Sequence, residues 1–215
     1  MSVALIILSK APVAGLAKTR LIPALGAQGA ADLAGQLLLH AVQQALQTPF
    51  EHLELCVSPE GAHPAFAQAQ ALAPGRLHWT AQGEGDLGAR MHRALVRRLV
   101  HEPSVLLMGT DAPGLSADVL KAAARALDCN DAVFVPACDG GYALVGLRRP
   151  CPGLFEGMAW STPQVMAETR LRARAAGLCW QELDPVFDID EATDLHHLPP
   201  DWPGRALLLK APASP

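Results

Sequence analysis

The sequence lacks a basic excess and a long apolar segment, and each absence excludes a class of protein. Its 215 residues include 17 lysines and arginines against 21 aspartates and glutamates, so the overall charge gives no reason to expect nucleic-acid binding. No apolar segment in it approaches the length of a membrane span. Any phosphate-binding site must therefore depend on a local gathering of charge.

Paired-cysteine motifs are also missing. The five cysteines are odd in number and form no C-x-x-C pair, which argues against both a disulfide framework and a zinc site. The apolar N-terminus, MSVALIIL, has no basic region and runs directly into Lys10 and Pro12, so it predicts a first strand rather than a signal peptide. We expect a cytoplasmic protein.

Short apolar runs alternate with segments of helical periodicity, and this alternation predicts an α/β fold. Strands are expected at 3–8, 53–57, 77–80, 105–108, 132–135 and 142–147, and helices at 27–47, 87–99 and 117–127. A further helix is expected between an N-cap at Ser161 or Thr162 and a stop at Gly177. Continuous apolar strands such as VLLM suit a mostly parallel sheet that is covered on both faces.

The length of the chain predicts one domain rather than two. We place this domain at 1–198 and a proline-rich C-terminal tail at 199–215. In open α/β sheets, ligands bind beyond the carboxyl ends of the strands. The residues that directly follow each predicted strand are therefore the candidates for a functional site.

The loop after the first predicted strand, SKAPVAGLAKTRL, carries three cations, Lys10, Lys18 and Arg20. A P-loop needs glycine directly before its lysine, and Ala17 stands there, so the Walker motif is excluded. The cations and the backbone near Gly15 can still bind phosphate oxygens. A solvated basic loop is the alternative.

Aspartates follow later strands. Asp111 in GTDAPGL comes after a strand too apolar to be exposed, where a carboxylate can bind Mg²⁺ or Mn²⁺; an N-cap or Asx turn is the alternative. Asp139 in CDGGY precedes two glycines that let the backbone approach a ligand closely. The same three residues can equally form an ordinary hairpin turn.

Asp188 and Asp190 lie two residues apart, on one face of the chain if it is extended. Two like charges held together are unfavourable without a cation between them, so the pair is a metal candidate, unless Asp190 caps a short helix. In QGEGDLGARM, Gly85 and Asp86 precede a predicted helix, and such a loop can hold a ribose or the edge of a base. No His-x-x-x-His pair and no G-x-S-x-G motif is present.

Six motifs in a single order carry a resemblance to a known family. They extend across nearly the whole chain: KAPVAGLAKTRL, GDLGARM, GTDAPGL, DGGYALVGL, WST and DIDEATDL. Together they resemble the bacterial GT-A-like glycosyltransferases known as radical-SAM/selenodomain-associated or arsenosugar-biosynthesis-type transferases. This family is similar to phospholactate and molybdenum-cofactor guanylyltransferases, which share the Asp-Gly-Gly turn and the D-x-D-x-x-x-D-L element.

The resemblance implies a single-domain nucleotide-diphospho-sugar transferase (GT-A, Rossmann-like) fold with a mostly parallel, mixed central sheet. It implies a transferase that uses a nucleotide-activated donor and Mg²⁺ or Mn²⁺, with glycosyl transfer to a small acceptor as the expected reaction. Nucleotidyl transfer to a small phosphorylated acceptor and a non-catalytic nucleotide-binding module are the alternatives. The first loop departs from the molybdenum-cofactor guanylyltransferases, whose loop is glycine-rich.

The expected site residues fall into three groups. They are catalytic Asp111 and Asp139; nucleotide- or phosphate-binding Lys10, Gly15, Lys18, Arg20, Gly85 and Asp86; and metal-binding Asp111, Asp188 and Asp190.

Overall fold

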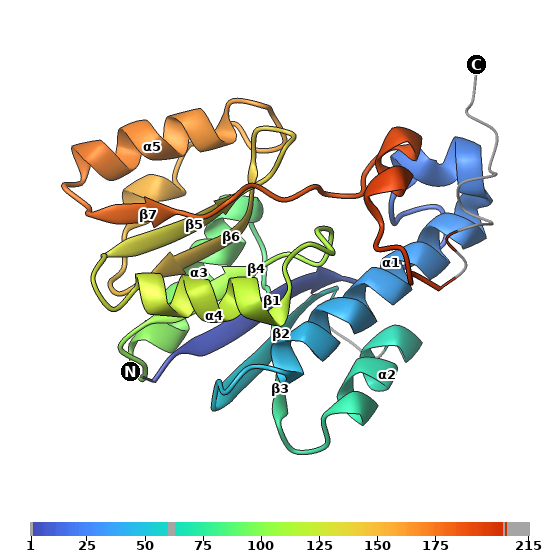
Figure 1. The fold of residues 1–215 in the computed structure, drawn as a ribbon, viewed down its shortest axis with the longest axis horizontal. Helices are drawn as coiled ribbons and strands as arrows, with labels where there is room; N and C mark the ends of the chain where they lie inside the picture. Colours follow the sequence, from blue (N-terminus) through green and yellow to red (C-terminus); the bar gives the residue numbers. More distant parts are fainter. Residues whose placement is uncertain (1, 60–62, 204, 206–215) are drawn as a thin grey trace.

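A seven-stranded sheet in the order β3-β2-β1-β4-β6-β5-β7 forms the centre of the computed structural model, which describes residues 2–59, 63–203 and 205 (Figure 1). The strands are β1 (Ala4–Lys10), β2 (His52–Ser58), β3 (Leu77–Ala81), β4 (Val105–Met108), β5 (Ala132–Pro136), β6 (Tyr142–Leu147) and β7 (Trp180–Glu182). The α-helices are α1 (Ile22–Leu46), α2 (Pro64–Leu72), α3 (Leu87–Leu99), α4 (Ala117–Ala126) and α5 (Val165–Ala175). Short 3₁₀ helices are η1 (Thr19–Leu21), η2 (Pro152–Leu154) and η3 (Ala192–His197).

The sheet is mixed. β1 pairs in parallel with β2 and β4, and β2 pairs in parallel with β3. β6 is antiparallel to both β4 and β5, and β7 is parallel to β5. The predicted α/β class and the mostly parallel, mixed sheet are confirmed, and β7 and α2 are elements that the sequence analysis missed.

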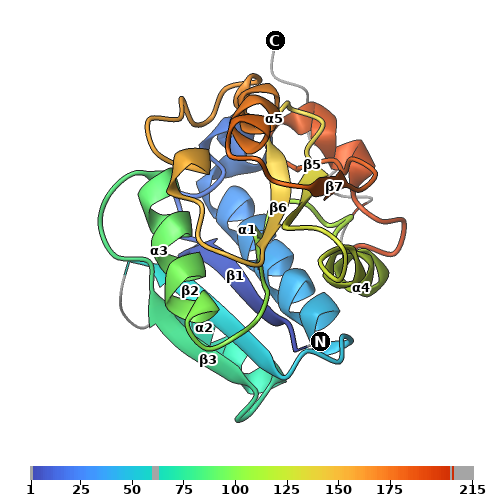
Figure 2. The same cartoon turned by 90° about the vertical axis from the view of Figure 1, so that its left-hand side faces the viewer.

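Helices cover both faces of the sheet, as the continuous apolar strands predicted (Figure 2). Along β1, Leu5 and Ile7 pack with residues of α1, α2 and α4. Ala4 and Ile6, which alternate with them, pack with residues of α3, α5 and η2 on the other face. A smaller apolar cluster joins α1 to η3 and to Trp202. The domain is thus a single three-layer structure, with helices on both faces of one sheet.

Glycines mark two of the helix boundaries. Gly26 (φ 71, ψ 165) interrupts α1, so the regular part of the helix begins where the periodicity placed it, at 27. Gly177 (φ 63) follows the C-cap of α5, as predicted.

The N-cap prediction for α5 was wrong, because Gln164 occupies that position and neither predicted side chain caps the helix. The Thr162 hydroxyl instead donates to the carbonyl of Ala159 (2.9 Å), and Ser161 has a left-handed backbone.

The C-terminal tail begins against the domain rather than away from it. Trp202 is buried, and its indole N–H donates to Gln36 of α1 (3.0 Å). Residue 204 and residues 206–215 of the predicted tail lie outside the described residues. None of the helices in the described part of the chain is long and apolar enough to cross a membrane.

Candidate functional site

The loops that follow β1 and β4 flank the point where the strand order reverses. Strands β2 and β3 are added to one side of β1, whereas β4 lies next to β1 on its opposite side. Open α/β sheets bind ligands in the crevice at such a switch point. After β7 the chain crosses the molecule toward the start of α1 (Figure 1), and this crossing segment carries Asp188 and Asp190. It therefore adds carboxylates to the same region.

Lys18 is the centre of the site. Its ammonium lies 2.6 Å from Oδ1 of Asp111, in the loop after β4, and donates to Oδ1 of Asp190 at 2.7 Å. The lysine side chain is only 6% exposed, whereas those of Asp111 and Asp190 are 55% and 39% exposed. One buried cation thus ties together three loops that are far apart in the sequence.

Opposing effects act on the pKa of Lys18. Burial, the largest effect, lowers the pKa, but the charges and hydrogen bonds of Asp111 and Asp190 together outweigh it, and the net result is a raised pKa. The ammonium therefore stays protonated at neutral pH. The sequence predicted that Lys18 faces phosphates, and its two carboxylate partners were not predicted.

The backbone holds Asp111 and Asp190 near each other independently of the lysine. Ile189 lies between Asp188 and Asp190, and its amide donates to the carbonyl of Asp111 (2.9 Å). Asp190 does not cap the following helix, because Glu191 is the N-cap of η3. The carboxylate of Asp194 accepts from the amides of Asp190 and Glu191 instead (3.0 and 2.7 Å). The Asp190 side chain is left to pair with Lys18.

Asp139 lies at the tip of the β5–β6 hairpin, so the alternative prediction of a hairpin turn for CDGGY is confirmed. Its Oδ1 accepts from the amide of Gly141 (2.8 Å), an Asx turn that shapes the tip. The amide of Cys138 donates to the carbonyl of Val186 (3.0 Å), which brings the crossing segment alongside the hairpin. Asp139 remains exposed, so the turn leaves its second oxygen available to a ligand.

Asp188 neighbours Asp139 rather than Lys18. Partial burial, followed by the charge of Asp139, raises the pKa of the Asp188 carboxyl to about 6. Asp190 and Asp194 add to the rise. Asp188 and Asp190, which were predicted to bind one metal together, therefore have different neighbours. Asp190 pairs with Lys18, whereas Asp188 lies near Asp139 of the hairpin. Within residues 2–59, 63–203 and 205, no group of three or more His, Cys, Asp or Glu side chains is arranged to hold a metal.

The other predicted phosphate ligands, Lys10, Gly15 and Arg20, are exposed in or beside the β1 loop. Arg20 lies 3.8 Å from Glu191, and both side chains are more than half exposed. The loop is closed on itself, because its amides at 13, 16 and 17 donate to loop carbonyls of Ala11 and Val13. Gly15 has φ 83, which permits this tight course.

The glycine-rich loop after β3 is held by arginines that the sequence analysis did not select. Arg90 donates to the carbonyl of Gly85 (2.9 Å) and Arg93 to that of Glu84 (2.8 Å). The carboxylate of Asp86, which was predicted to bind a nucleotide, accepts from the amide of Ala89 (2.8 Å) and caps α3. Arg90 and Arg93 lie three residues apart, and so on one face of the helix that follows the loop. This spacing could have indicated that both contact the loop.

Buried Gln82 joins this loop to the sheet. Its side-chain amide donates to the carbonyls of Ser9 and Cys56 (2.9 and 3.1 Å), near the carboxyl ends of β1 and β2. The loop is thereby fixed at the carboxyl ends of the strands, the edge of the sheet at which Lys18 also lies. Gln82 was not predicted as a site residue, because a single glutamine forms no recognisable motif.

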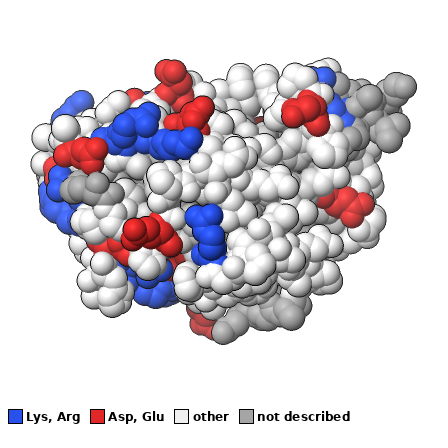
Figure 3. Space-filling model, turned by 60° about the horizontal axis from the view of Figure 1, so that its bottom comes forward, with Lys and Arg blue, Asp and Glu red and all other residues white. Residues whose placement is uncertain are grey.

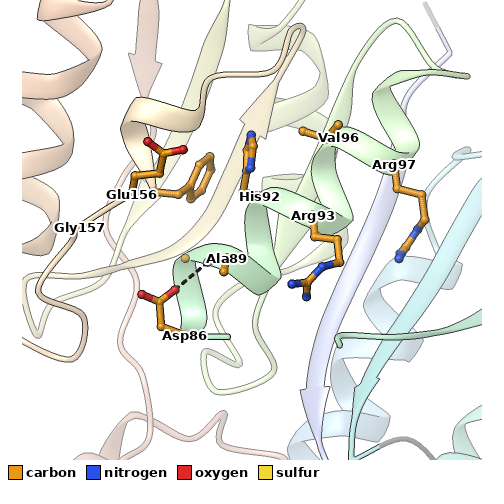
Figure 4. Close-up of a pocket in the computed structure, with 10 residues that line it drawn as sticks. Asp86, Ala89, His92, Arg93, Val96, Arg97, Glu156 and Gly157 are labelled. Atoms are coloured by element: carbon orange, nitrogen blue, oxygen red, sulfur yellow. Dashed lines mark hydrogen bonds between the residues drawn. The ribbon is translucent and has the colours of Figure 1, made fainter. Parts of the chain in front are cut away.

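A shallow cavity of about 700 Å³ runs along α3 (Figure 4). Asp86, His92, Arg93, Arg97 and Glu156 contribute its polar lining. Of the predicted site residues, Asp86 alone lines this cavity in the described part of the chain, and there its carboxylate is engaged by Ala89. The cavity is therefore separate from the Lys18 centre.

Charges of both signs are scattered over the face seen in Figure 3, where no continuous basic surface appears. This distribution agrees with the slight acidic excess of the whole chain.

The fold is shared with solved structures of nucleotide-linked transferases. A protein of Desulfovibrio desulfuricans G20, described as a "putative nucleotide-diphospho-sugar transferase", is 28% identical with a TM-score of 0.85 over 98% of this chain and 95% of that one. CMP:2-keto-3-deoxy-manno-octonic acid synthetase, solved with CTP, is 13% identical with a TM-score of 0.58 over 98% and 99%. Rv0371C of Mycobacterium tuberculosis H37Rv, solved with manganese, is 18% identical with a TM-score of 0.56 over 92% and 98%.

The chain belongs to the family described as "Uncharacterized protein conserved in bacteria (DUF2064)", which it matches over residues 39–162, more than half of its length. No curated protein matches the sequence. The structural neighbours support a nucleotide-linked transferase activity. The radical-SAM-associated or arsenosugar-type subfamily stays a prediction.

Proposed function

We propose that this protein is a transferase that takes a glycosyl group from a nucleotide-diphospho-sugar and passes it to a small acceptor. The observation that carries the proposal is the convergence of Lys18, Asp111 and Asp190 at the switch point of the sheet. Isolated buried charges are costly, and this set includes two carboxylates that remain accessible to solvent. Such an arrangement is better explained by a ligand site than by stability.

The closed β1 loop favours a diphosphate donor over a triphosphate. Loops that cradle a triphosphate do so with free backbone N–H groups, and three amides of this loop are already bonded within it. Side chains must then supply the positive charge, and Lys10 and Arg20 are exposed for this purpose. We place Gly15, Gly85 and Asp86 along the nucleotide, with Asp86 acting there through the loop that it helps to fix.

Asp111 and Asp190 suit Mg²⁺ or Mn²⁺. Their oxygens already converge on one cation, and Mg²⁺ typically binds one or two carboxylates together with substrate phosphates rather than a complete protein cage. The lack of a three-ligand cluster in the described residues is compatible with that mode. The manganese complex of Rv0371C gives further support. When bound, such an ion neutralises the negative charge that develops on a leaving diphosphate.

Asp139 and Asp188 would serve the acceptor. Asp139 is exposed at the hairpin tip beside the crossing segment, and its free oxygen can orient an acceptor hydroxyl. Asp188 holds a carboxyl with a pKa near 6 next to it, which suits proton transfer near neutral pH. We assign Asp139 and Asp111 the catalytic positions and place Asp188 with Asp139 on the acceptor side.

Nucleotidyl transfer is the second candidate, favoured by the likeness to a synthetase solved with CTP. The two reactions release different products: glycosyl transfer releases a nucleoside diphosphate, whereas nucleotidyl transfer releases pyrophosphate. A nucleotide-binding module without catalysis would bind donor and release neither.

The test is a product assay with a panel of nucleotide sugars and nucleoside triphosphates, each with Mn²⁺ and with Mg²⁺. We expect nucleoside diphosphate from at least one nucleotide sugar, and its loss in Asp111→Asn. Asp118→Asn is the matched control, because Asp118 is a 92% exposed aspartate on α4 that pairs with Lys121. Release of pyrophosphate would replace the proposal by the second candidate, and binding without turnover would replace it by the third.

A further inference from the structure

Lys18 occupies the position that a divalent ion on Asp111 and Asp190 would need. Its ammonium contacts Oδ1 of both carboxylates, at 2.6 and 2.7 Å. Mg²⁺ would lie at about 2.0–2.1 Å from the same kind of oxygen. The ammonium and the ion cannot share these two oxygens, since each takes the space between them and two cations at that separation repel strongly.

The backbone at Lys18 has a conformation that is unusual for a lysine. Lys18 has φ 47 and ψ 47, a left-handed conformation that non-glycine residues rarely adopt. Such conformations persist where surrounding interactions hold them, and they are concentrated at functional sites. Two sets of contacts hold Lys18 here: it is the N-cap of η1, where its carbonyl accepts from the amide of Leu21 (2.8 Å), and its ammonium pairs with the two carboxylates.

The alternative position for the ammonium is close by. Lysine carries a compact charge on a flexible four-carbon stem, and the turn around Gly15 next to it is exposed. The phosphates of a donor bound over the β1 loop would offer oxygens to an ammonium released from the carboxylates.

We propose that Lys18 is an internal counter-ion that occupies the metal position of the empty site and exchanges with the metal when the nucleotide donor binds. This inference rests on the proposed function for the metal and the donor. In the resting protein the lysine neutralises Asp111 and Asp190 and prevents a metal ion from binding them tightly. The arrival of phosphates gives the ammonium a second partner, so nucleotide and metal bind with positive cooperativity.

The test measures Mn²⁺ binding to the protein without nucleotide, by electron paramagnetic resonance and calorimetry. We expect Lys18→Gln to bind Mn²⁺ at least about tenfold more tightly than the wild type, because it removes one positive charge from the metal position. Lys121→Gln is the matched control: it makes the same charge change on α4, where Lys121 pairs with exposed Asp118 and lies outside the proposed site. Lys121→Gln should alter Mn²⁺ affinity by less than about twofold, since charges near the surface are screened.

A second measurement uses the wild-type protein and does not depend on the folding of any variant. Lysine acetylation followed by mass spectrometry reports whether the ammonium is accessible. Lys18 should be protected without Mn²⁺ and should become reactive when saturating Mn²⁺ is added, while exposed Lys10 reacts equally in both states.

The outcomes separate this inference from the proposed function. If UDP, GDP, CDP and ADP with Mn²⁺ all fail to bind the wild type, the proposed function fails and the exchange fails with it. If nucleotide and Mn²⁺ do bind, but Lys18→Gln binds Mn²⁺ alone no better than Lys121→Gln does, the exchange alone is wrong. Unchanged acetylation of Lys18 at saturating Mn²⁺ would overturn it equally.

Discussion

Gly140, at the tip of the β5–β6 hairpin, should tolerate no side chain, and the reason combines backbone conformation with packing. Its φ is +94, and a Cβ added there would lie 2.2 Å from the carbonyl oxygen of Pro163 and 2.7 Å from its carbonyl carbon. The carbonyl of Gly140 also accepts from the amide of Met166 (2.8 Å), in the first turn of α5. The hairpin tip, which carries Asp139, is thus fitted closely to the chain that leads into α5.

The expected destabilisation can be built from three contributions. A left-handed backbone costs a non-glycine residue about 1–2 kcal/mol, of which part is returned because alanine restricts the unfolded chain. Overpacking against fixed backbone adds about 1–3 kcal/mol. Moving the tip away from Pro163 weakens the hydrogen bond to Met166, at about 1 kcal/mol. Gly140→Ala should therefore lower the free energy of unfolding by about 3–5 kcal/mol.

Two other glycines separate these contributions. Gly177 has φ +63 but nothing within 4 Å of an added Cβ, so Gly177→Ala should cost only the backbone contribution, about 1 kcal/mol. Gly153 has open space and no positive φ, so Gly153→Ala should be close to neutral. Urea unfolding followed by circular dichroism gives all three values on one scale. A Gly140→Ala protein that is no less stable than Gly177→Ala would refute the packing argument.

Two further predictions test the roles of other side chains. Asp86→Ala should cost about 1 kcal/mol, because it removes the N-cap of α3, whereas Asp86→Asn should unfold at nearly the wild-type urea concentration; equal losses in both variants would contradict the capping role. Hydrogen bonds from Arg170 lower the pKa of Glu182 below its usual 4.5, so this pair contributes stability above pH 4.5 that is lost as the pH falls through the lowered pKa. Arg170→Gln should therefore destabilise the protein at pH 7 and have less effect at pH 3, and an equal effect at both values in urea unfolding would count against it.

Local pattern was sufficient for much of the fold. Continuous apolar strands have to be covered on both faces, so the mostly parallel sheet with helices on each side followed from runs such as VLLM in β4. Elements with weak patterns were missed. β7 is three residues long and pairs only with β5 among the described strands, and α2 is a short segment made largely of alanine and glutamine.

The sequence by itself placed Lys18 and Asp111 directly after predicted strands, and therefore at one edge of the sheet. Asp190 follows β7, which the pattern did not reveal, so strand prediction alone did not place it there. Only the tertiary structure decided how their charges are matched. Lys18 and Asp190 are 172 residues apart in the chain, and no local pattern can specify an ion pair over that distance. Their pairing depends on strand order, on the crossing segment after β7, and on a left-handed turn that places the ammonium between two carboxylates.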